Sequence, residues 1–383
     1  MDNLQLENFD PVIFLRDVWQ KKPLLIPAGF SNFRDPLSPD ELAGLALEDE
    51  IESRLITYMN EGASWRVDHG PFTESDFSIT DKNWTLLVQS VNHYLPKAAE
   101  ILTAFRFIPD WRMDDLMVSY ASDQGSVGPH FDNYDVFLIQ GLGQRRWRVG
   151  QSCQGDEALL DHPELKILAD FDVTMEYLLS PGDILYVPPG IAHWGISQGQ
   201  SMVYSVGFRA PSYSEILSHW TDYSLEHHRE EKYFRDIGLN AKQHPAEITP
   251  LALHQLKNIM HQLLDQPSKM ESWFAELVTQ NKYGDERTDD VVYTKEQIAL
   301  LAIQGIHLQR SPKARLAFIR RQTYLDLFTN GKQIKSRLAT QNFIEHLCLE
   351  QTLNNHDLKE FTKNKENLIV LTELINLQCF NII

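Results

Sequence analysis

Three residues of types that bind transition metals stand in two short segments of the sequence. His130 and Asp132 are two positions apart, directly before a strand-like run, and His193 follows a segment rich in proline and glycine. Side chains two positions apart in an extended chain point to the same face. An imidazole and a carboxylate on one face supply two of the three ligands of the facial triad that holds non-haem iron(II). We expect His193 to supply the third ligand from a second strand.

A triad of this kind leaves metal positions open, and the chemistry depends on them. A 2-oxo acid fills two open positions and dioxygen fills another, so the pattern predicts an oxygenase with His130, Asp132 and His193 as its catalytic metal ligands. No thiolate accompanies the motif, which argues against a structural zinc site. Zinc held by two histidines and one carboxylate stays open on ligand type alone. The His-x-Asp pair is a weak signal by itself, and the third ligand beyond an intervening turn and strand strengthens it.

A run of arginines offers a partner for an acidic co-substrate. Arg145, Arg146 and Arg148 lie in a strand-like segment that follows a glycine-containing turn. A guanidinium presents a rigid fork of donors that matches a carboxylate. Alternation along the strand places Arg145 and Trp147 on one face and the other two arginines on the opposite face. One inward-facing arginine therefore suits the distal carboxylate of 2-oxoglutarate, and the others suit a solvated face.

The elements that must position these residues lie between residues 110 and 210. Short apolar segments alternate there with turns that contain Gly, Pro or Asp, a pattern typical of a β-sandwich or barrel. We predict strands at 116–121, 136–140, 146–149, 175–179, 184–187, 193–197 and 202–208.

The 383 residues are enough for two or three domains, and four segments are predicted. Residues 1–95 are a mixed α/β lead-in that flanks the strand-rich core at 96–211. Residues 212–280 are helical, and two roles stay open for them: packing within one chain, or the interface of a homodimer. Residues 281–383 begin with a polar linker at 281–290 and continue with a helix, a hairpin and further helices, a pattern that suggests a winged helix.

Composition limits the classes of partner. The chain carries 35 Lys and Arg against 53 Asp and Glu, a formal net charge of −18. Such a chain repels phosphate backbones and attracts basic proteins, so direct nucleic-acid binding is not expected, even for the basic stretch 307–324. No apolar run is long enough to span a bilayer and no signal peptide is evident, so we expect a cytoplasmic protein. Three widely separated cysteines predict neither a disulfide framework nor a thiolate zinc site.

The segments that carry the metal motif resemble those of a known family. Residues 127–137 and 181–190 look like the bacterial ribosomal oxygenases of the JmjC type, and the likeness extends to residues 19–23, 38–46 and 204–211. The resemblance implies an α+β fold with a double-stranded β-helix (cupin) core, a helical dimerisation region and a C-terminal winged helix. It also implies hydroxylation of an arginine side chain of a large-subunit ribosomal protein, with iron(II), 2-oxoglutarate and dioxygen.

The resemblance assigns roles to individual residues. The metal ligands of the family fall on the three residues of the triad, and its basic residue for 2-oxoglutarate falls on Arg145. Its substrate pocket falls on Asp115, Met117, Tyr134 and Ser205, and Ser205 is also expected to border the co-substrate. A carboxylate pairs with a guanidinium, while a thioether and a phenol ring pack along its stem. Core packing is an equally ordinary role for Met117 and Tyr134.

Other functions stay open because a fold does not fix a substrate. Related proteins act on histidine or demethylate lysine, and Asp115 favours a cationic substrate without separating hydroxylation from demethylation. A non-catalytic, ribosome-associated binding module is the rival from another class. The intact triad and Arg145 count against that rival.

Overall fold

The computed structural model describes residues 4–59, 64–78, 82–209, 211–227, 232–235, 244–281 and 292–383. The chain divides into two compact units, Met1–Ala210 and Pro211–Ile383. The linker expected at 281–290 lies outside the described residues apart from Asn281. Within the described ranges, no helix is both long enough and apolar enough to cross a membrane.

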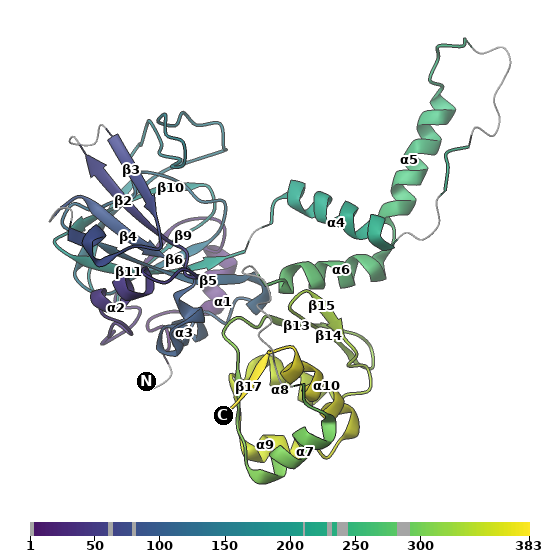
Figure 1. Ribbon diagram of the computed structural model, residues 1–383. Helices are drawn as coiled ribbons and strands as arrows, with labels where there is room; N and C mark the ends of the chain where they lie inside the picture. Colours follow the sequence, from purple (N-terminus) through teal and green to yellow (C-terminus); the bar gives the residue numbers. More distant parts are fainter. Residues whose placement is uncertain are drawn as a thin grey trace. The chain divides into compact units, whose positions relative to one another are not determined.

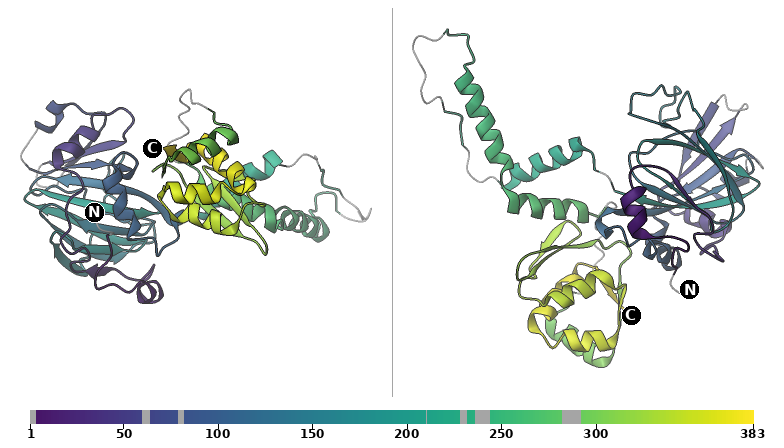
Figure 2. Two further views of the ribbon diagram at one scale, coloured as in Figure 1. Left: turned by 90° about the horizontal axis from the view of Figure 1, so that it is seen from below. Right: turned by 180° about the vertical axis from the view of Figure 1, so that it is seen from behind.

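Two antiparallel sheets make up most of the first unit (Figure 1, Figure 2). In order, the larger sheet contains β1 (Leu24–Ile26), β9 (Ile184–Val187), β6 (Val136–Gln140), β11 (Ser201–Phe208), β5 (Met113–Ala121), β4 (Trp84–Val88), β2 (Ser53–Met59) and β3 (Ser64–His69). The smaller sheet contains β10 (Ile191–Gln198), β7 (Gln144–Ser152) and β8 (Met175–Leu179). This arrangement confirms the double-stranded β-helix fold that the resemblance implies.

The strands predicted from the sequence are all present, and several extend beyond the expected bounds. The pattern did not predict β2, β3 and β4, which lie in the lead-in segment and continue the larger sheet beyond β5. Four of the five residues of β4 are buried, including neighbours that point to opposite faces. A strand that is buried on both faces has no alternation of apolar and polar residues to detect.

Helices cover one face of the larger sheet. They are α1 (Pro11–Asp17), α2 (Pro39–Leu45) and α3 (Pro96–Thr103), and short 3-10 helices lie at Glu74–Ser78, Val91–His93 and Asp110–Arg112. A capping box begins α2: the Ser38 hydroxyl accepts from the Glu41 amide, while the Glu41 carboxylate accepts from the Ser38 amide. Asp10 caps α1 in a similar way, accepting from the amides of Val12 and Ile13.

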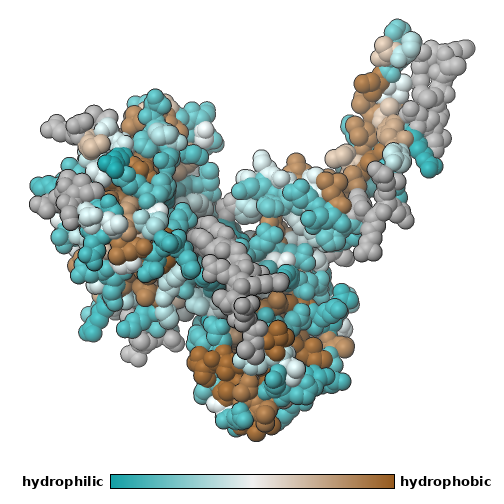
Figure 3. Space-filling model, viewed as in Figure 1, coloured by the Kyte–Doolittle hydropathy of each residue, from teal (hydrophilic) through white to brown (hydrophobic). Residues whose placement is uncertain are grey.

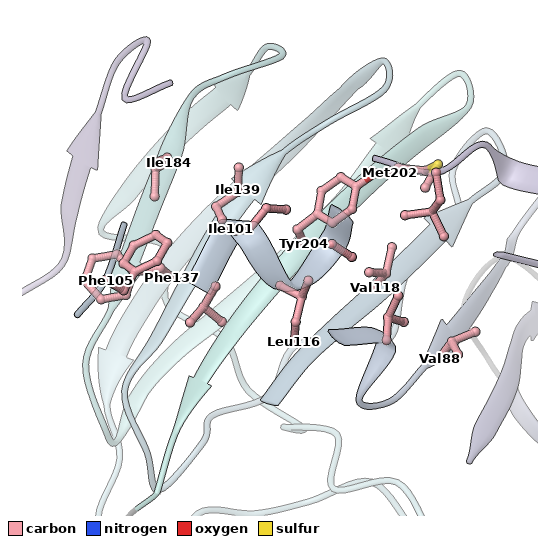
Figure 4. Packing of buried hydrophobic residues seen from close by; sticks show 14 of the residues in the cluster. Val88, Ile101, Phe105, Leu116, Val118, Phe137, Ile139, Ile184, Met202 and Tyr204 are labelled. Carbon is pink, nitrogen blue, oxygen red and sulfur yellow. The ribbon is translucent and has the colours of Figure 1, made fainter. Parts of the chain in front are cut away.

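The main hydrophobic core lies between these helices and the outer face of the larger sheet. Figure 4 shows Phe105 beside Phe137 of β6, and Ile101 beside Ile139 of the same strand. The rings of Phe105 and Phe137 are 4.7 Å apart between centroids. Burial of each such side chain stabilises the fold by roughly 1.5–3 kcal/mol. This core holds the strands rigidly, so their opposite faces can present polar groups at fixed positions.

The inner faces of the two sheets pack against one another. Apolar contacts there join Val136, Leu138, Leu185, Val187 and Val203 of the larger sheet to Trp147, Val149 and Leu179 of the smaller sheet. Strand alternation turns a set of buried polar residues to the same inner face, namely Asp115, Ser119, Ser201 and Ser205. Buried polar groups need partners, which makes the space between the sheets the place to look for a site.

The second unit begins with three helices, α4 (Tyr213–His227), α5 (Pro250–Leu264) and α6 (Pro267–Thr279). The rest of the unit contains α7 (Lys295–Gln304), β12 (Leu308–Arg310), β13 (Leu316–Arg320), β14 (Leu325–Thr329), β15 (Lys332–Ile334), α8 (Gln341–Leu349), β16 (Thr352–Leu353), α9 (Asn355–Phe361), α10 (Lys365–Asn376) and β17 (Phe380–Ile382). The expected helix, hairpin and further helices are therefore present.

A tight turn and a helix–sheet contact organise this unit. Asn330 and Gly331 have φ values of 47° and 76° and connect β14 to β15, as the Asn-Gly pair predicts. The amide of Gly331 donates to the hydroxyl of Thr279 at 3.3 Å, and Glu271 pairs with Arg321. These contacts place α6 against the β13–β15 sheet. The four-segment division of the sequence stays a prediction, and α6 contacts the sheet that follows the linker.

Candidate metal centre

The three candidate ligands come together between the two sheets because the backbone joins their segments. The amide of His130 donates to the carbonyl of His193 at 3.1 Å, and the amide of His193 donates to the carbonyl of His130 at 2.8 Å. The amide of Gly190 also donates to the carbonyl of Asp132 at 2.7 Å. The turn that precedes β10 is thus tied to the His-x-Asp segment by main-chain hydrogen bonds alone, so the side chains stay free for chemistry.

The ligand atoms of His130, Asp132 and His193 all lie within 4.8 Å of one another. The Oδ2 of Asp132 is 4.0 Å from the Nε2 of His130 and 3.6 Å from the Nε2 of His193. Two imidazole nitrogens and one carboxylate oxygen gathered this closely fit a divalent metal ion. The structure brings together the triad that the sequence predicts.

Hydrogen bonds to the backbone set the tautomer of both histidines. The Nδ1 of His130 lies 3.0 Å from the carbonyl oxygen of Gly128, and the Nδ1 of His193 lies 3.1 Å from that of Ile191. A carbonyl only accepts, so each Nδ1 carries the proton and each Nε2 keeps its lone pair for a metal. Burial lowers the pKa of His193 to about 4, so this imidazole is neutral at pH 7. The donor set therefore suits iron(II) in a facial triad.

Arg145 is a buried cation on the inner face of β7. Its Nε and Nη2 donate to the hydroxyl and carbonyl of Ser201 at 3.1 and 3.3 Å, and its Nη1 donates to Ser119 at 2.9 Å. No acidic side chain pairs with it among the residues that the structure describes, and burial lowers its pKa to about 9. It remains a cation at neutral pH, and a buried cation without a counter-ion is costly. An acidic ligand that entered the site would supply the missing charge.

The neighbouring arginines face the other way, as strand alternation predicts. Arg146 and Arg148 both pair with Glu176 of β8, at 2.6 and 2.8 Å. Their side chains are about one-third exposed, whereas Arg145 is 5 % exposed. Only Arg145 among the three therefore lies on the face of the metal ligands.

Asp115 and Tyr134 converge near the metal centre over a glycine. A methyl group built on Gly207 would lie 3.7 Å from the Oδ1 of Asp115 and 4.0 Å from the ring of Tyr134. The absence of a side chain at Gly207 therefore keeps open the space that these two residues border. Tyr134 as a whole is 42% exposed, but desolvation around its phenol oxygen raises the pKa of the phenol, and the nearby carboxylates of Asp132 and Asp115 raise it further. This space lies next to a metal ligand.

Met117 and Ser205 extend the same inner face. They are partners across β5 and β11, in register with one another, and Ser205 is 6 % exposed. Asp115 is two positions before Met117, and Gly207 is two positions after Ser205, so all four point to the space between the sheets. The candidate pocket residues thus form one continuous surface.

Several residues of the site were not found from the sequence. Ser119 and Ser201 hold Arg145, and Ser90 holds Asp115 through its amide and its hydroxyl at 3.0 and 2.9 Å. Asp135 is fully buried and accepts from the Tyr186 hydroxyl at 2.6 Å, which anchors the chain next to Tyr134. Among these serines, only Ser119 had a signal in the sequence, because strand alternation relative to Asp115 marks it as inward-facing.

Known proteins resemble this chain over nearly its whole length. Residues 100–216 match the family model described as JmjC domain, and residues 261–381 match that described as ROXA-like winged helix. The chain is 41% identical over 364 residues to the ribosomal protein uL16 3-hydroxylase of Escherichia coli (strain K12), covering 95% of both proteins. It is 30% identical over 361 residues to a probable ribosomal oxygenase of Haemophilus influenzae, covering 92% of this chain and 88% of that protein.

Solved structures agree with the sequence relatives. The X-ray structure of E. coli ycfD covers 100% of both chains with a TM-score of 0.89 and 37% identity. A structure of YcfD, described as a ribosomal oxygenase in complex with cobalt and 2-oxoglutarate, covers 99% of both chains with a TM-score of 0.86 and 36% identity. These similarities confirm the JmjC core and the winged helix that the resemblance implied. By the metal triad, the fold and its relatives, the chain belongs to the JmjC-domain ribosomal oxygenases.

Proposed function

We propose that this chain is an iron(II)- and 2-oxoglutarate-dependent oxygenase that hydroxylates an arginine side chain of a large-subunit ribosomal protein. The observation that carries the proposal is that the metal triad and Arg145 face the same space between the two sheets. Arg145 is a buried cation with no acidic partner among the described residues. The relative from E. coli is named for uL16, and YcfD was solved with cobalt, which stands in for iron(II), and with 2-oxoglutarate.

The bound iron would supply the oxidation, in which 2-oxoglutarate and dioxygen yield succinate, carbon dioxide and one oxygen atom inserted into a carbon–hydrogen bond. His130, Asp132 and His193 hold the metal on one side and leave its other positions open. Arg145 binds the distal carboxylate of 2-oxoglutarate, and Ser119 keeps the guanidinium extended between the sheets. Ser205 lies on the same inner face and borders both the co-substrate and the substrate pocket.

The pocket suits a long cationic side chain. Asp115 pairs with the guanidinium head, while Tyr134 and Met117 pack along the stem. Ser90 fixes one oxygen of Asp115 with two hydrogen bonds, and the other oxygen faces the space over Gly207. A head group held there places the carbons of the stem near the metal ligands, so carbon is the expected site of oxidation.

The partner is a basic protein, which the net charge of −18 attracts. We place the reaction in the cytoplasm, where ribosomal proteins are made and assembled. Arginines of the basic stretch in the winged helix serve internal contacts: Arg320 pairs with Glu345, and Arg321 pairs with Asp326 and Glu271. These pairings support a structural or interaction role for the module over direct nucleic-acid binding.

Hydroxylation of uL16 tests the proposal. Purified protein with iron(II) and 2-oxoglutarate should add one oxygen atom to a single arginine-containing peptide of uL16, as measured by mass spectrometry. The gain should need protein, metal and co-substrate together. Replacing the target arginine by lysine should reduce it strongly, because a point-charge ammonium does not reproduce the guanidinium fork.

The same assay separates the rival functions. Methyl loss from a methyl-lysine peptide, without oxidation of uL16, would make the chain a demethylase. Oxidation of a histidine instead of an arginine would make it a histidine hydroxylase. Absence of any conversion of 2-oxoglutarate to succinate would leave a non-catalytic ribosome-associated binding module.

We also propose that the chain forms a homodimer through the helices between residues 212 and 280. α5 has no buried residue, and Figure 3 shows apolar surface along it. Its apolar side chains are between 37% and 50% exposed, namely Leu251, Leu253, Leu256, Ile259, Met260 and Leu264. Contiguous apolar surface of this kind marks an interaction site in a water-soluble protein. A second copy presents the same surface and can cover it by symmetry.

Light scattering tests the dimer. At micromolar concentration the protein should show twice the chain mass of 44.3 kDa. Combining Leu256→Asp with Met260→Asp should give the monomer mass, because both charges would be buried in the interface. Leu300→Asp, at an exposed position of α7, is the matched control and should leave the mass unchanged. A monomer mass for the unmodified protein would refute the proposal.

A further inference from the structure

Trp147 has a buried indole N–H for which the described residues provide no acceptor. The residue is 5 % exposed and lies on the inner face of β7, between Arg145 and Val149. An indole N–H is a donor only, and native proteins rarely leave such a donor unpaired in their interior. Packing alone does not require this N–H, so the unpaired donor calls for a partner that the described residues do not provide.

The register of the smaller sheet places this donor between the two parts of the site. His193 is paired with Val149, Gly195 with Trp147, and Ser197 with Arg145. Each step is two residues, or roughly 7 Å along the strands, and keeps the same face. The ring of Trp147 is 6.0 Å from that of the metal ligand His193 between centroids. Along the strand direction, Trp147 therefore lies between the metal ligand His193 and Arg145.

Gly195 allows the indole to lie directly against the partner strand. A methyl group built on Gly195 would come within 2.8, 2.9 and 3.0 Å of three carbons of the Trp147 ring. These distances are shorter than a normal contact, so any larger residue would push the indole out of its place. The close approach fixes the position of the ring, and with it the position of the N–H.

We propose that the indole N–H of Trp147 donates a hydrogen bond to a carboxylate oxygen of 2-oxoglutarate. This inference rests on the proposed function, because that function places the co-substrate between Arg145 and the metal. 2-Oxoglutarate carries a carboxylate at each end, and a ligand that extends from Arg145 toward the metal passes the level of Trp147. Trp147 is then a binding residue for the co-substrate, and Gly195 is a positioning residue that acts through it.

Trp194 provides a matched comparison on the neighbouring strand. Its Nε1 already donates to the hydroxyl of Ser126 at 2.9 Å, and its ring packs edge-on against Phe171. This indole has no need of a ligand. The two tryptophans therefore differ in the feature that the inference depends on.

Nitrogen-15 NMR of the indole groups tests the inference on the full chain loaded with zinc, which is diamagnetic and does not turn over. Spectra of Trp147→Phe and Trp194→Phe assign the two cross-peaks. Adding 2-oxoglutarate should shift the Trp147 peak strongly and leave the Trp194 peak nearly in place. Calorimetry should show that Trp147→Phe weakens 2-oxoglutarate binding by about tenfold, the effect of losing one hydrogen bond to a charged group, while Trp194→Phe binds like the unmodified protein.

The outcomes separate this inference from the proposed function. If the unmodified protein does not bind 2-oxoglutarate, the proposed function fails. If it binds, but the Trp147 peak stays in place and Trp147→Phe binds equally well, a trapped water satisfies the N–H and the inference alone is overturned.

Thermal unfolding distinguishes binding from structure. Without 2-oxoglutarate, Trp147→Phe should melt near the temperature of the unmodified protein, because no internal hydrogen bond is lost. The rise in Tm that saturating 2-oxoglutarate produces should shrink in this variant. Gly195→Ala keeps the N–H but displaces it, so it should also weaken binding. A variant that melts much lower without ligand and binds with unchanged affinity would show a structural role instead.

Discussion

Asp132→Ala should abolish metal binding and turnover while leaving the fold intact. Its carboxylate is the only anionic ligand of the triad, with its Oδ2 4.0 and 3.6 Å from the two histidine nitrogens. Loss of a residue that only orients a metal ligand already lowers metal affinity or activity by about 10- to 100-fold. Loss of a ligand itself should therefore reduce turnover by roughly a thousandfold or more. Conversion of 2-oxoglutarate to succinate measures turnover, and calorimetry with manganese(II) measures the metal site.

The fold should survive because Asp132 supports it through the backbone. The amide of Gly190 donates to the carbonyl of Asp132, and that bond does not involve the side chain. Unfolding by heat should therefore occur near the temperature of the unmodified protein. Asp161→Ala, which removes an exposed carboxylate of the same unit, is the control and should keep full turnover. Full turnover by Asp132→Ala would show that the ligands are assigned wrongly.

The metal triad was predictable because its information is largely local. The His-x-Asp spacing fixes two ligands on one face of an extended chain, and the turn before β10 marks the third. The inward face of Arg145 followed from alternation together with the family resemblance, and the pairing of Arg146 and Arg148 with Glu176 agrees with it. These signals depend on positions a few residues apart.

Contacts that depend on the pairing of strands far apart in the sequence could not be predicted. Ser201 meets Arg145 although 56 positions separate them, because β11 and β7 contribute to opposite sheets of the same interior. Ser90 reaches Asp115 from a left-handed backbone conformation with a φ of 52°, which nothing in its sequence neighbourhood indicates. Strand β4 escaped prediction for a related reason, since burial on both faces removes the alternating pattern. The sequence therefore predicted the ligands of the site better than the residues that orient them.

Arg145→Ala should raise the 2-oxoglutarate requirement sharply, by roughly 100-fold in KM or Kd, since truncation of one partner in a buried charge pair costs several kcal/mol. The guanidinium is buried, is held by Ser119 and Ser201, and has no acidic partner among the described residues, so its charge is directed to a ligand. The variant should keep its metal affinity, because Arg145 lies two levels along the sheet from His193. Manganese(II) and 2-oxoglutarate titrations by calorimetry separate these two affinities.

Arg146→Ala is the matched control for this prediction, on the same strand and one position away. Arg146 pairs with Glu176 on the other face, in an ion pair that is about one-third exposed, and exposed pairs contribute little. Its loss should change the 2-oxoglutarate requirement by less than about twofold, because this side chain does not face the co-substrate. Arg145→Lys should keep part of the affinity that Arg145→Ala loses, since lysine retains the charge without the bidentate fork. Equal effects of Arg145→Ala and Arg146→Ala would show that the side of the strand on which an arginine lies does not decide which one binds the co-substrate. The burial of the Arg145 cation would then need another explanation.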